Sequence, residues 1–384
     1  MEWSARLLTP VDEPLPRRRR SELLAEIEAS GLTGRGGAAF PAARKLAAVA
    51  RAGNPVVVAN GTEGEPASWK DKVLLTKNPH LVIDGAVVAA RIVGAREIVF
   101  AVGRANRTVR KRLLHALEER SDGIHAIVET VPDRFVAGEE SAVVNMLNGG
   151  PAKPTTRKPF ETGVLVQNVE TLANLGLIAR YGAGWFRERG TPEEPGTVLV
   201  TVLGAVRRPG VAEVDLSTPM RDVVQRFGGL SAIPQALLVG GYFGTWVRAQ
   251  DVLELPLTNG AFKTLGASLG ARTIIVLPPD ACGLAESTRV ARYLADESAG
   301  QCGPCLFGVA AIANALERLD VGRLRRLAPQ VADRGACAHP TGATRFVASA
   351  VDVFGDEIAR HAAGRCCSPA HPPVLPLGSS REWR

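Results

Sequence analysis

Apolar residues recur with two different periods in the first half of the chain, and together they predict an α/β domain. Short runs of β-branched residues, such as VVVA at 56–59, are typical of buried parallel strands. Between these runs, apolar residues recur every three or four positions, as they do along helices. The pattern predicts helices at 21–30, 81–93, 104–120 and 169–181, a helix that ends at 147, and strands at 56–59, 97–102, 125–131 and 164–168. This alternation predicts a parallel sheet with helices on its faces, an α/β fold of the Rossmann-like class.

The pattern changes twice in the second half of the chain. After a polar linker, two stretches at 197–203 and 211–216 alternate like strands on either side of an Arg-Pro-Gly turn. With a short helix at 220–227 and a strand at 237–239, this region predicts a β-grasp module. Beyond one more strand at 273–277, four amphipathic stretches predict a helical bundle.

These patterns divide the chain into five parts. The boundaries that we predict are an N-terminal helical segment at 1–30, the α/β domain at 31–190, the β-grasp module at 195–270, the four-helix bundle at 273–363 and a flexible tail at 364–384. Cys366 and Cys367 lie in this tail and have no evident partner. A chain of 384 residues is long enough for two or three separate cores.

Composition and charge exclude several classes of protein. The chain is 46% hydrophobic and 22% charged, as ordinary globular proteins are. Its formal net charge is +7, yet lysines and arginines are scattered, and the basic run at 17–20 contains no aromatic residue. We therefore expect no nucleic-acid partner. The run is either a solvated segment or part of a basic face that docks an acidic electron-transfer protein.

The sequence also predicts a cytoplasmic protein that does not insert directly into a membrane. Residues 1–16 lack the apolar core of a signal peptide, and the longest apolar stretch, around 83–93, is too short to cross a bilayer. Thiols are reduced in the cytoplasm, so the six cysteines indicate metal or redox chemistry and not disulfides.

A glycine-rich segment at 31–46, GLTGRGGAAFPAARKL, is the first candidate for a ligand-binding loop. It contains Gly34, Arg35, Gly36, Gly37 and Lys45. Glycines let bare backbone amides approach a phosphate, and nearby cations attract it. The segment fits the dinucleotide fingerprint G-x-G-x-x-A, but it follows a predicted helix where that fingerprint follows a strand. We therefore predict a nucleotide or flavin loop of another type, with a tight turn as the alternative.

Two acidic segments are further candidates. The first follows the strand at 56–59, where α/β proteins place ligands, and it contains Glu63 and Glu65. These carboxylates suit ribose hydroxyls or an amide, and an acidic surface turn is the alternative. The second places Glu139 and Glu140 in the first turn of a helix, where capping of that helix is the alternative.

Three cysteines have a spacing that is typical of metal sites. Cys302 and Cys305 form a C-x-x-C between two predicted helices, and Cys337 lies in another such loop, two residues before His339. A thioredoxin-like motif would need a βαβ context, which is missing here. The spacing fits both a zinc site with His339 as fourth ligand and an iron–sulfur cluster.

In their order along the chain, these motifs resemble those of the flavin-bearing, NADH-oxidising subunit of respiratory complex I. Diaphorase subunits of NAD-reducing hydrogenases and formate dehydrogenases are similar. The motifs, within 31–358, are GRGGAAF, VVVANGTEGEP, KDK, NPHLVIDG, VAGEES, QNVETLAN, ESAGQCGPC and GAC. The resemblance implies an α/β domain that binds FMN and NADH, a β-grasp module of the SLBB (ubiquitin-like) type, and a bundle that carries a [4Fe–4S] cluster.

The resemblance also implies roles for single residues. Those expected at the FMN are Gly34, Gly36, Gly37, Lys45, Asn60, Gly138, Glu139, Glu140 and Asn168, with Arg35 and Glu63 as further cofactor-binding candidates. Those expected at the NADH are Phe40 and Phe160, which would flank the adenine, and Glu65 and Lys158. Glu65 and Glu140 are the candidate catalytic residues. The candidate metal ligands are Cys302, Cys305 and Cys337.

The chain departs from the family pattern near the expected nucleotide site. It has Thr62 where the family has aspartate and Gln167 where the family has asparagine. The loop between Phe160 and Gln167 is shorter than in the family. The segment GVLVQNV is also similar to the NADH-binding subunit of Rnf-type ferredoxin oxidoreductases.

The largest departure lies in the cluster loop. The family pattern is C-x-x-C-x-x-C, and Ala299 replaces its first cysteine. A four-iron cluster then needs a non-standard fourth ligand, or the cluster is a [3Fe–4S] form. The nearby candidate ligands are Cys282, Ser298 and His339, besides solvent. Loss of the cluster and a zinc-stabilised bundle are the alternatives.

The sequence therefore predicts an NADH dehydrogenase subunit that passes a hydride from NADH to FMN and single electrons through the cluster to a partner. Candidate partners are a ferredoxin, a small [2Fe–2S] subunit or a membrane reductase. We expect a hetero-oligomer in the cytoplasm or at the inner face of the plasma membrane. A non-catalytic docking or assembly subunit that keeps the fold is the alternative, motivated by Thr62, Ala299 and the shortened loop.

Overall fold

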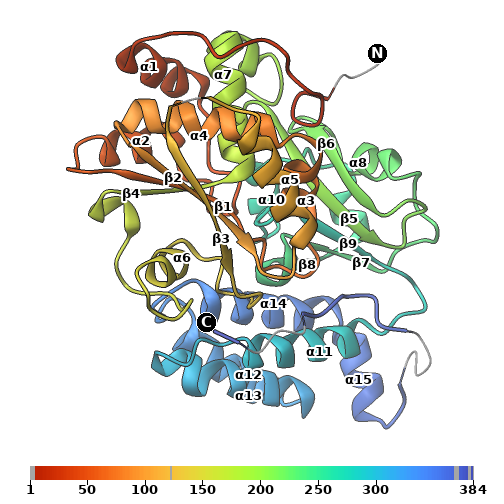
Figure 1. Cartoon of the computed structure of the whole chain (residues 1–384). Coiled ribbons are helices and arrows are strands. Elements are labelled where there is room, and N and C mark those ends of the chain that lie inside the picture. The colour runs from red at the N-terminus through yellow and green to blue at the C-terminus, as the bar shows by residue number, and fades with distance from the viewer. Residues whose placement is uncertain (1–4, 122, 367–371, 379–381, 384) are drawn as a thin grey trace.

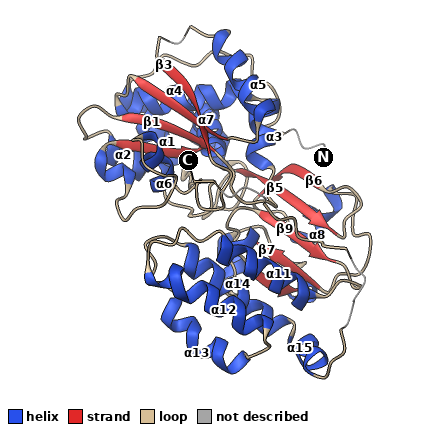
Figure 2. Ribbon diagram, turned by 60° about the horizontal axis from the view of Figure 1, so that its bottom comes forward, coloured by secondary structure: helices blue, strands red, loops and turns tan. Residues whose placement is uncertain are grey.

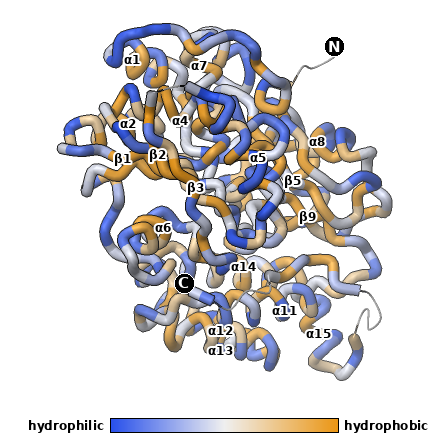
Figure 3. The backbone as a smooth tube through the Cα atoms, viewed as in Figure 1, coloured by the Kyte–Doolittle hydropathy of each residue, from blue (hydrophilic) through white to orange (hydrophobic). Residues whose placement is uncertain are grey.

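The computed structural model describes residues 5–121, 123–366, 372–378 and 382–383. In this part of the chain, an α/β domain and a β-grasp module each contain one sheet, and a helical bundle packs against them (Figures 1 and 2). Hydrophobic residues concentrate along the strands of both sheets (Figure 3). None of the helices in the described residues has the length and hydrophobicity that a membrane span requires.

The first sheet has four parallel strands. They are β1 (Val56–Gly61), β2 (Glu97–Gly103), β3 (His125–Val131) and β4 (Val164–Asn168), in the order β3-β2-β1-β4. In the register of β1 and β4, Asn60 lies opposite Asn168. Two polar side chains therefore meet at the carboxyl edge of the sheet, which is the edge where α/β proteins bind ligands.

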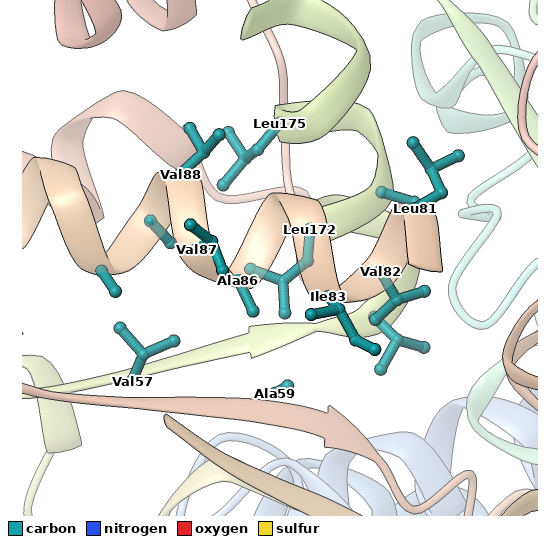
Figure 4. Packing of buried hydrophobic residues seen from close by; sticks show 14 of the residues in the cluster. Val57, Ala59, Leu81, Val82, Ile83, Ala86, Val87, Val88, Leu172 and Leu175 are labelled. Carbon is teal, nitrogen blue, oxygen red and sulfur yellow. The ribbon is translucent and has the colours of Figure 1, made fainter. Parts of the chain in front are cut away.

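Helices cover both faces of this sheet. They are α1 (Arg20–Ser30), α2 (Ala42–Val49), α3 (Lys70–Lys77), α4 (Pro79–Val93), α5 (Arg107–Glu118), α6 (Glu140–Leu147), the 3-10 turn η1 (Pro159–Thr162) and α7 (Val169–Arg187). Val57 and Ala59 pack on the side of α4 and α7 (Figure 4), whereas Val58 packs on the side of α6. The helices α4 and α7 touch because Gly85 lies against the Leu172 carbonyl, where a Cβ atom would be 1.6 Å away.

The β-grasp module has a mixed sheet of five strands. They are β5 (Thr197–Gly204), β6 (Gly210–Asp215), β7 (Ala236–Val239), β8 (Thr245–Arg248) and β9 (Thr273–Leu277), in the order β6-β5-β9-β7-β8. Connecting segments include α8 (Met220–Arg226), η2 (Gly241–Phe243), α9 (Ala249–Val252) and α10 (Asn259–Lys263). The strand β9 is central, parallel to β5 and antiparallel to β7. The sheet therefore extends beyond the predicted end of the module at 270.

The bundle has five α-helices within the described residues, where the sequence predicts four. They are α11 (Gly283–Asp296), α12 (Val309–Glu317), α13 (Val321–Val331), α14 (His339–Val353) and α15 (Gly355–Ala362), with a π-helical turn η3 (Pro304–Gly308) before α12. The helix α14 contacts the β-grasp sheet, where the Trp246 backbone N–H donates to Ser349 Oγ over 2.9 Å. The additional helix, α15, buries only Glu357 fully.

The described part of the C-terminal tail packs against the rest of the molecule, although the sequence predicts a flexible segment. Leu375 is buried, and its backbone N–H donates to Glu286 of α11 over 2.8 Å. The Ala152 N–H donates to the Trp383 carbonyl over 2.9 Å. Apolar side chains anchor the tail. The sequence prediction missed this because it rested on the proline and serine content of the segment. Cys367 lies outside the described residues.

Candidate functional site

The glycine-rich loop crosses the carboxyl edge of the first sheet between α1 and α2. Its ends are joined by a hydrogen bond from Gly34 N–H to the Phe40 carbonyl over 2.8 Å. A Cβ atom on Gly36 would lie 3.2 Å from Asn168 Cβ, at the end of β4. Gly37 has a φ of +118°, a conformation that favours glycine. The loop therefore brings bare backbone to the polar edge of the sheet.

Arg35 does not present a free cation in this loop, contrary to the prediction. Its side chain is buried, and Nη2 donates to the Pro195 carbonyl over 3.0 Å. Its backbone N–H donates to Thr171 Oγ1, and its carbonyl accepts from Arg272. Burial lowers the pKa of Arg35 to about 9. We infer that Arg35 anchors the loop to the linker before β5.

Asn60 and Asn168 organise the carboxyl edge. Asn60 Nδ2 donates to the Gly138 carbonyl over 2.8 Å, which joins β1 to the loop before α6. Asn168 caps α7, because its Oδ1 accepts from the Glu170 N–H over 3.0 Å. Its Nδ2 donates to Asp71 Oδ2 over 2.6 Å. The predicted residues Gly36, Asn60, Gly138 and Asn168 therefore share one edge of the sheet.

A buried charge network that the sequence analysis did not single out lies behind this edge. Lys70 Nζ is 2.6 Å from Asp71 Oδ1 and 2.8 Å from Glu170 Oε2, and all three residues are buried. Burial opposes the charge of Lys70, but the two carboxylates raise its pKa above the ordinary value. These residues belong to the motifs KDK and QNVETLAN. The motifs therefore contain the charged residues but do not show which of them form ion pairs.

Glu63 caps a helix and does not face an open site, which corrects its assignment as a cofactor contact. Its side chain is 3% exposed. Its carboxylate accepts from the N–H groups of Asp71 and Lys72, over 3.0 and 3.1 Å, at the start of α3. Burial and the charge of Asp71 raise the pKa of Glu63. The residue adopts a φ of +48°, which is uncommon for a side chain of this size.

Glu65 joins the α/β domain to the β-grasp module. Its Oε2 accepts from the Tyr242 N–H over 2.8 Å, and its Oε1 from the Ala67 N–H over 3.3 Å. Gly241 packs so closely that a Cβ atom there would be 2.5 Å from Oε2. Burial raises the pKa of Glu65 to about 7. The protein's own backbone thus already uses both oxygens of this predicted catalytic residue.

The two acidic residues at the start of α6 have different environments. Glu139 caps α6 by accepting from the N–H groups of Ser141 and Ala142, over 2.9 and 3.2 Å, and burial raises its pKa. Glu140 is 32% exposed at its side chain and forms an ion pair with Lys45. The structure therefore brings together the two predicted residues Lys45 and Glu140, from elements 95 positions apart.

Two aromatic rings expected near a nucleotide also meet. The centroids of Phe40 and Phe160 are 6.2 Å apart and their planes differ by 21°. Phe40 is 46% exposed, and Lys158 Nζ lies 6.0 Å from the Phe160 ring. An exposed ring that lies nearly parallel to a half-buried one, beside a cation, is suited to stack on a flat heterocycle.

The three predicted metal ligands approach one another in the bundle. Cys302 and Cys305 lie around the start of η3, and Cys337 precedes α14. Burial raises the pKa of Cys337 to about 11, and the charges of Cys305, Glu139 and Cys302 add to the effect. The cysteine loops and the acidic start of α6 are therefore neighbours.

The position of the missing fourth ligand is filled by Ala299, which is buried. Its carbonyl accepts from Lys153 Nζ over 2.9 Å. Cys282 is excluded as a substitute, because it caps the opposite end of α11, about 20 Å away at 1.5 Å per residue. The Ser298 hydroxyl donates to the Cys305 carbonyl over 3.3 Å. The described residues around this loop therefore offer three thiols, those of Cys302, Cys305 and Cys337, as candidate ligands.

The other candidate ligand, His339, has one ring nitrogen without a hydrogen-bond partner among the described residues. Its Nε2 is 2.8 Å from the Leu294 carbonyl, and its Nδ1 has no hydrogen-bond partner among the described residues. Burial lowers the pKa of His339 to about 4, so the ring is neutral at pH 7. It packs against Phe135 and Phe243.

Direct contacts join the α/β domain to the cysteine loop. Gln301 Nε2 donates to the Pro154 carbonyl over 2.6 Å, next to the contact between Lys153 and Ala299. Arg134 and Glu297 form a buried ion pair with 3.1 Å between Nε and Oε2. The flavin edge (the residues around Gly36, Asn60, Gly138 and Asn168) and the cysteine loop (298–305) are thus held in a fixed relation.

Comparison with known proteins agrees with this arrangement. Residues 27–176 match the Nuo51 FMN-binding domain, residues 199–241 the SLBB domain, and residues 285–361 the NADH-ubiquinone oxidoreductase-F iron-sulfur binding region. The matches follow the order of the α/β domain, the β-grasp module and the bundle. They confirm the fold class and the family resemblance predicted from the sequence.

Individual relatives match along most of the chain. An NADH-quinone oxidoreductase subunit of Rhizobium meliloti is 28% identical, over 90% of each chain. The NADP-reducing hydrogenase subunit HndC of Solidesulfovibrio fructosivorans is 27% identical, over 91% of this chain and 78% of that protein. A solved NAD+-reducing [NiFe]-hydrogenase superposes with a TM-score of 0.81 and 28% identity, over 94% of this chain and 68% of that one. The chain belongs to the family of flavoprotein subunits that occur in complex I and in NAD-reducing hydrogenases.

Proposed function

We propose that this chain is an NADH dehydrogenase subunit that binds FMN at the flavin edge and delivers electrons through the cysteine loop to a partner protein. Bound FMN accepts a hydride and releases its electrons singly, which is chemistry that side chains cannot supply. The task of the chain is then to bind, orient and insulate the cofactors. The observation that carries the proposal is the convergence of the glycine loop, Asn60 and Asn168 at one carboxyl edge.

The flavin edge has the chemistry that a flavin phosphate and ring require. Gly36 is exposed and Gly37 half-buried, so a phosphate can approach their backbone, whereas the Gly34 amide already donates to the Phe40 carbonyl. Lys45 supplies the positive charge that the buried Arg35 cannot, and Glu140 holds it in place. The network of Lys70, Asp71 and Glu170 orients Asn168 from behind.

The NADH is proposed to lie on the side of Phe40 and Phe160. We propose that these rings flank the adenine, with Lys158 near the phosphates of the NADH. Glu140 is partly exposed and can accept from a ribose hydroxyl or the nicotinamide amide. Both carboxylate oxygens of Glu65 already accept from backbone amides, so we propose that its contact with the NADH is weaker than that of Glu140.

Cys302, Cys305 and Cys337 are proposed to hold an iron–sulfur cluster. Three thiolates fit a [3Fe–4S] form, or a [4Fe–4S] form whose fourth iron is bound by His339 Nδ1 or by solvent. The contacts of Lys153 and Gln301 keep this loop against the α/β domain.

The partner is proposed to be an electron carrier in a hetero-oligomer. A ferredoxin, a [2Fe–2S] subunit and a membrane reductase all fit, and a net charge of +7 favours an acidic carrier. Relatives named as subunits of NADH-quinone oxidoreductase and of hydrogenase support such an assembly, in the cytoplasm or peripheral to the membrane.

An anaerobic absorption spectrum, recorded before and after NADH, tests the proposal, with FMN and iron quantified on the same sample. We expect about one FMN per chain and bleaching of its absorption by NADH. A sample that is reconstituted with excess FMN, freed of unbound flavin, and then contains no FMN and never oxidises NADH would contradict the enzyme assignment.

Ala299 favours a second candidate, a non-catalytic docking subunit that keeps the fold. An alanine in place of a ligand is expected where a cluster is no longer maintained. In that case the chain would bind neither FMN nor iron but would still assemble with its partner, and co-purification without cofactors would distinguish the two functions.

A further inference from the structure

A second group of metal-binding side chains lies at the end of α11 that is remote from the cysteine loop. Cys282 precedes α11, His361 lies in the last turn of α15, and Cys366 follows that helix. Their ligand atoms all lie within 4.8 Å of one another, and Cys282 Sγ is 3.3 Å from His361 Nε2. Elements almost 80 positions apart in the sequence thus converge on one point.

The surroundings of Cys282 suit a thiolate. Its Sγ accepts from the Ala285 N–H over 3.3 Å, so it caps α11. A helix N-terminus favours negative charge. The side chain is 4% exposed, whereas His361 is half-buried and Cys366 is exposed. An ion can therefore reach the group from the side of Cys366 and be enclosed at Cys282.

Glu357 supports the group from α15. Its Oε2 accepts from the Leu284 N–H over 2.8 Å and from the Cys282 thiol over 3.4 Å. It is the only fully buried residue of this helix. The carboxylate is therefore fixed beside the sulfur, as outer partners of metal ligands commonly are.

We propose that Cys282, His361 and Cys366 bind one zinc ion, with Glu357 or water in the fourth position. Two sulfurs and one imidazole are a ligand set that zinc prefers. Tetrahedral zinc holds such atoms about 3.5–3.8 Å apart, close to the spacing seen here. Binding releases one proton from each thiol, and the imidazole binds in its neutral form.

The zinc ion would fasten α15 to the start of α11. This helix has little other attachment, because only Glu357 is fully buried. The site is about 20 Å from the cysteine loop, as the 14 residues of α11 imply. Its occupancy is therefore independent of FMN and of the iron–sulfur cluster.

Metal analysis of the purified full chain, kept reduced and free of chelators, tests the proposal. We expect about one zinc per chain in the wild type, and less than about 0.2 in Cys282→Ser and His361→Ala. The tail variant replaces both Cys366 and Cys367, because the second cysteine follows directly in the sequence. The matched control is Cys337→Ser, which alters the other cysteine group and should keep its zinc while its iron content falls.

A measurement on the wild type covers the case in which the variants do not fold. Chelator-treated protein is titrated with Co²⁺ under reducing conditions, and the visible bands of tetrahedral cobalt–thiolate are expected at one equivalent. Added Zn²⁺ should slow hydrogen exchange in α15 and leave η3 unchanged. Absence of zinc together with absence of cobalt bands in reduced protein would overturn the proposal, as would full zinc retention in all three site variants.

Discussion

The flavin edge and the cysteine loop are neighbours, but they differ in how far the protein itself supplies partners and donor side chains for their polar groups. At the flavin edge, Asn60, Asn168 and Lys70 all have protein partners. In the cysteine loop, Ala299 leaves one ligand position without a donor side chain, and beside this loop the half-buried thiol of Cys337 has a raised pKa. The protein's own contacts therefore complete the polar groups of the first region, whereas the second lacks a donor side chain at residue 299. We therefore expect substitutions at the flavin edge to abolish function and substitutions in the cysteine loop to change it only partly.

The largest effect is expected from Gly36→Val. The added side chain would enter the space beside Asn168, where even a Cβ atom would be 3.2 Å from Asn168 Cβ. Overpacking of this kind costs about 3 kcal/mol, or about 100-fold in FMN affinity. Fluorescence titration with FMN measures the change. Gly53→Val is the control, because a Cβ atom at Gly53 meets nothing within 4 Å. Stoichiometric FMN in Gly36→Val would show that the loop is not the phosphate site.

Lys70→Met should destabilise the fold by about 3–5 kcal/mol, because it leaves two buried carboxylates without their cation. Asp71 and Glu170 are the carboxylates concerned. Urea unfolding followed by circular dichroism measures the loss. Lys77→Met, at an exposed position of the same helix, should change stability little. Equal stability of the two variants would mean that the network contributes nothing to the flavin edge.

Glu65→Gln should remove a pH dependence of stability. The pKa of Glu65 rises from 4.5 to about 7 on folding, because the carboxyl is buried. The unfolded chain therefore loses this proton at lower pH than the folded chain does. Between pH 4.5 and about 7 the wild type should lose about 2 kcal/mol relative to the variant. Urea midpoints of both proteins at pH 5 and pH 7.5 measure the difference, and parallel pH profiles would refute it.

The smallest change, one iron atom per chain, is expected from Ala299→Cys. A thiol at this buried position would supply the missing ligand and convert a three-iron cluster into a four-iron cluster. Iron analysis and low-temperature electron paramagnetic resonance of the reduced protein distinguish the two forms. Ala299→Ser, with a similar volume and a poorer ligand, should leave the iron content unchanged. An unchanged spectrum in the cysteine variant would mean that residue 299 does not face the metal.

The fold was largely predictable because hydrophobic periodicity is a local signal. The strand at 125–131 has the predicted bounds, and those of the strand at 97–102 differ by one residue. The central place of β9 was not predictable, because the spacing of hydrophobic residues does not show which distant strands pair. The tail was misjudged for a related reason: its few apolar residues, Leu375 among them, pack against helices that are distant in the sequence.

The candidate site was predictable as a set of residues but not as a set of contacts. Sequence motifs identified Asn60, Lys45 and Glu140, and the structure brings them to one region. The motifs did not reveal that Arg35 and Glu63 are used by the protein itself, because the partners are the distant Pro195 carbonyl and the start of α3. A charged residue in a motif marks a place where charge is needed, whether by a ligand or by the backbone.

The loop that follows α6 has a consequence for how the two cofactors communicate. Lys153 and Pro154 hold the cysteine loop, and Lys158, four positions later, faces the ring of Phe160. Under the proposed function, a nucleotide bound beside Lys158 and a cluster held by the cysteine loop would contact the same short segment. The redox potential of the cluster is then expected to change when the nucleotide binds.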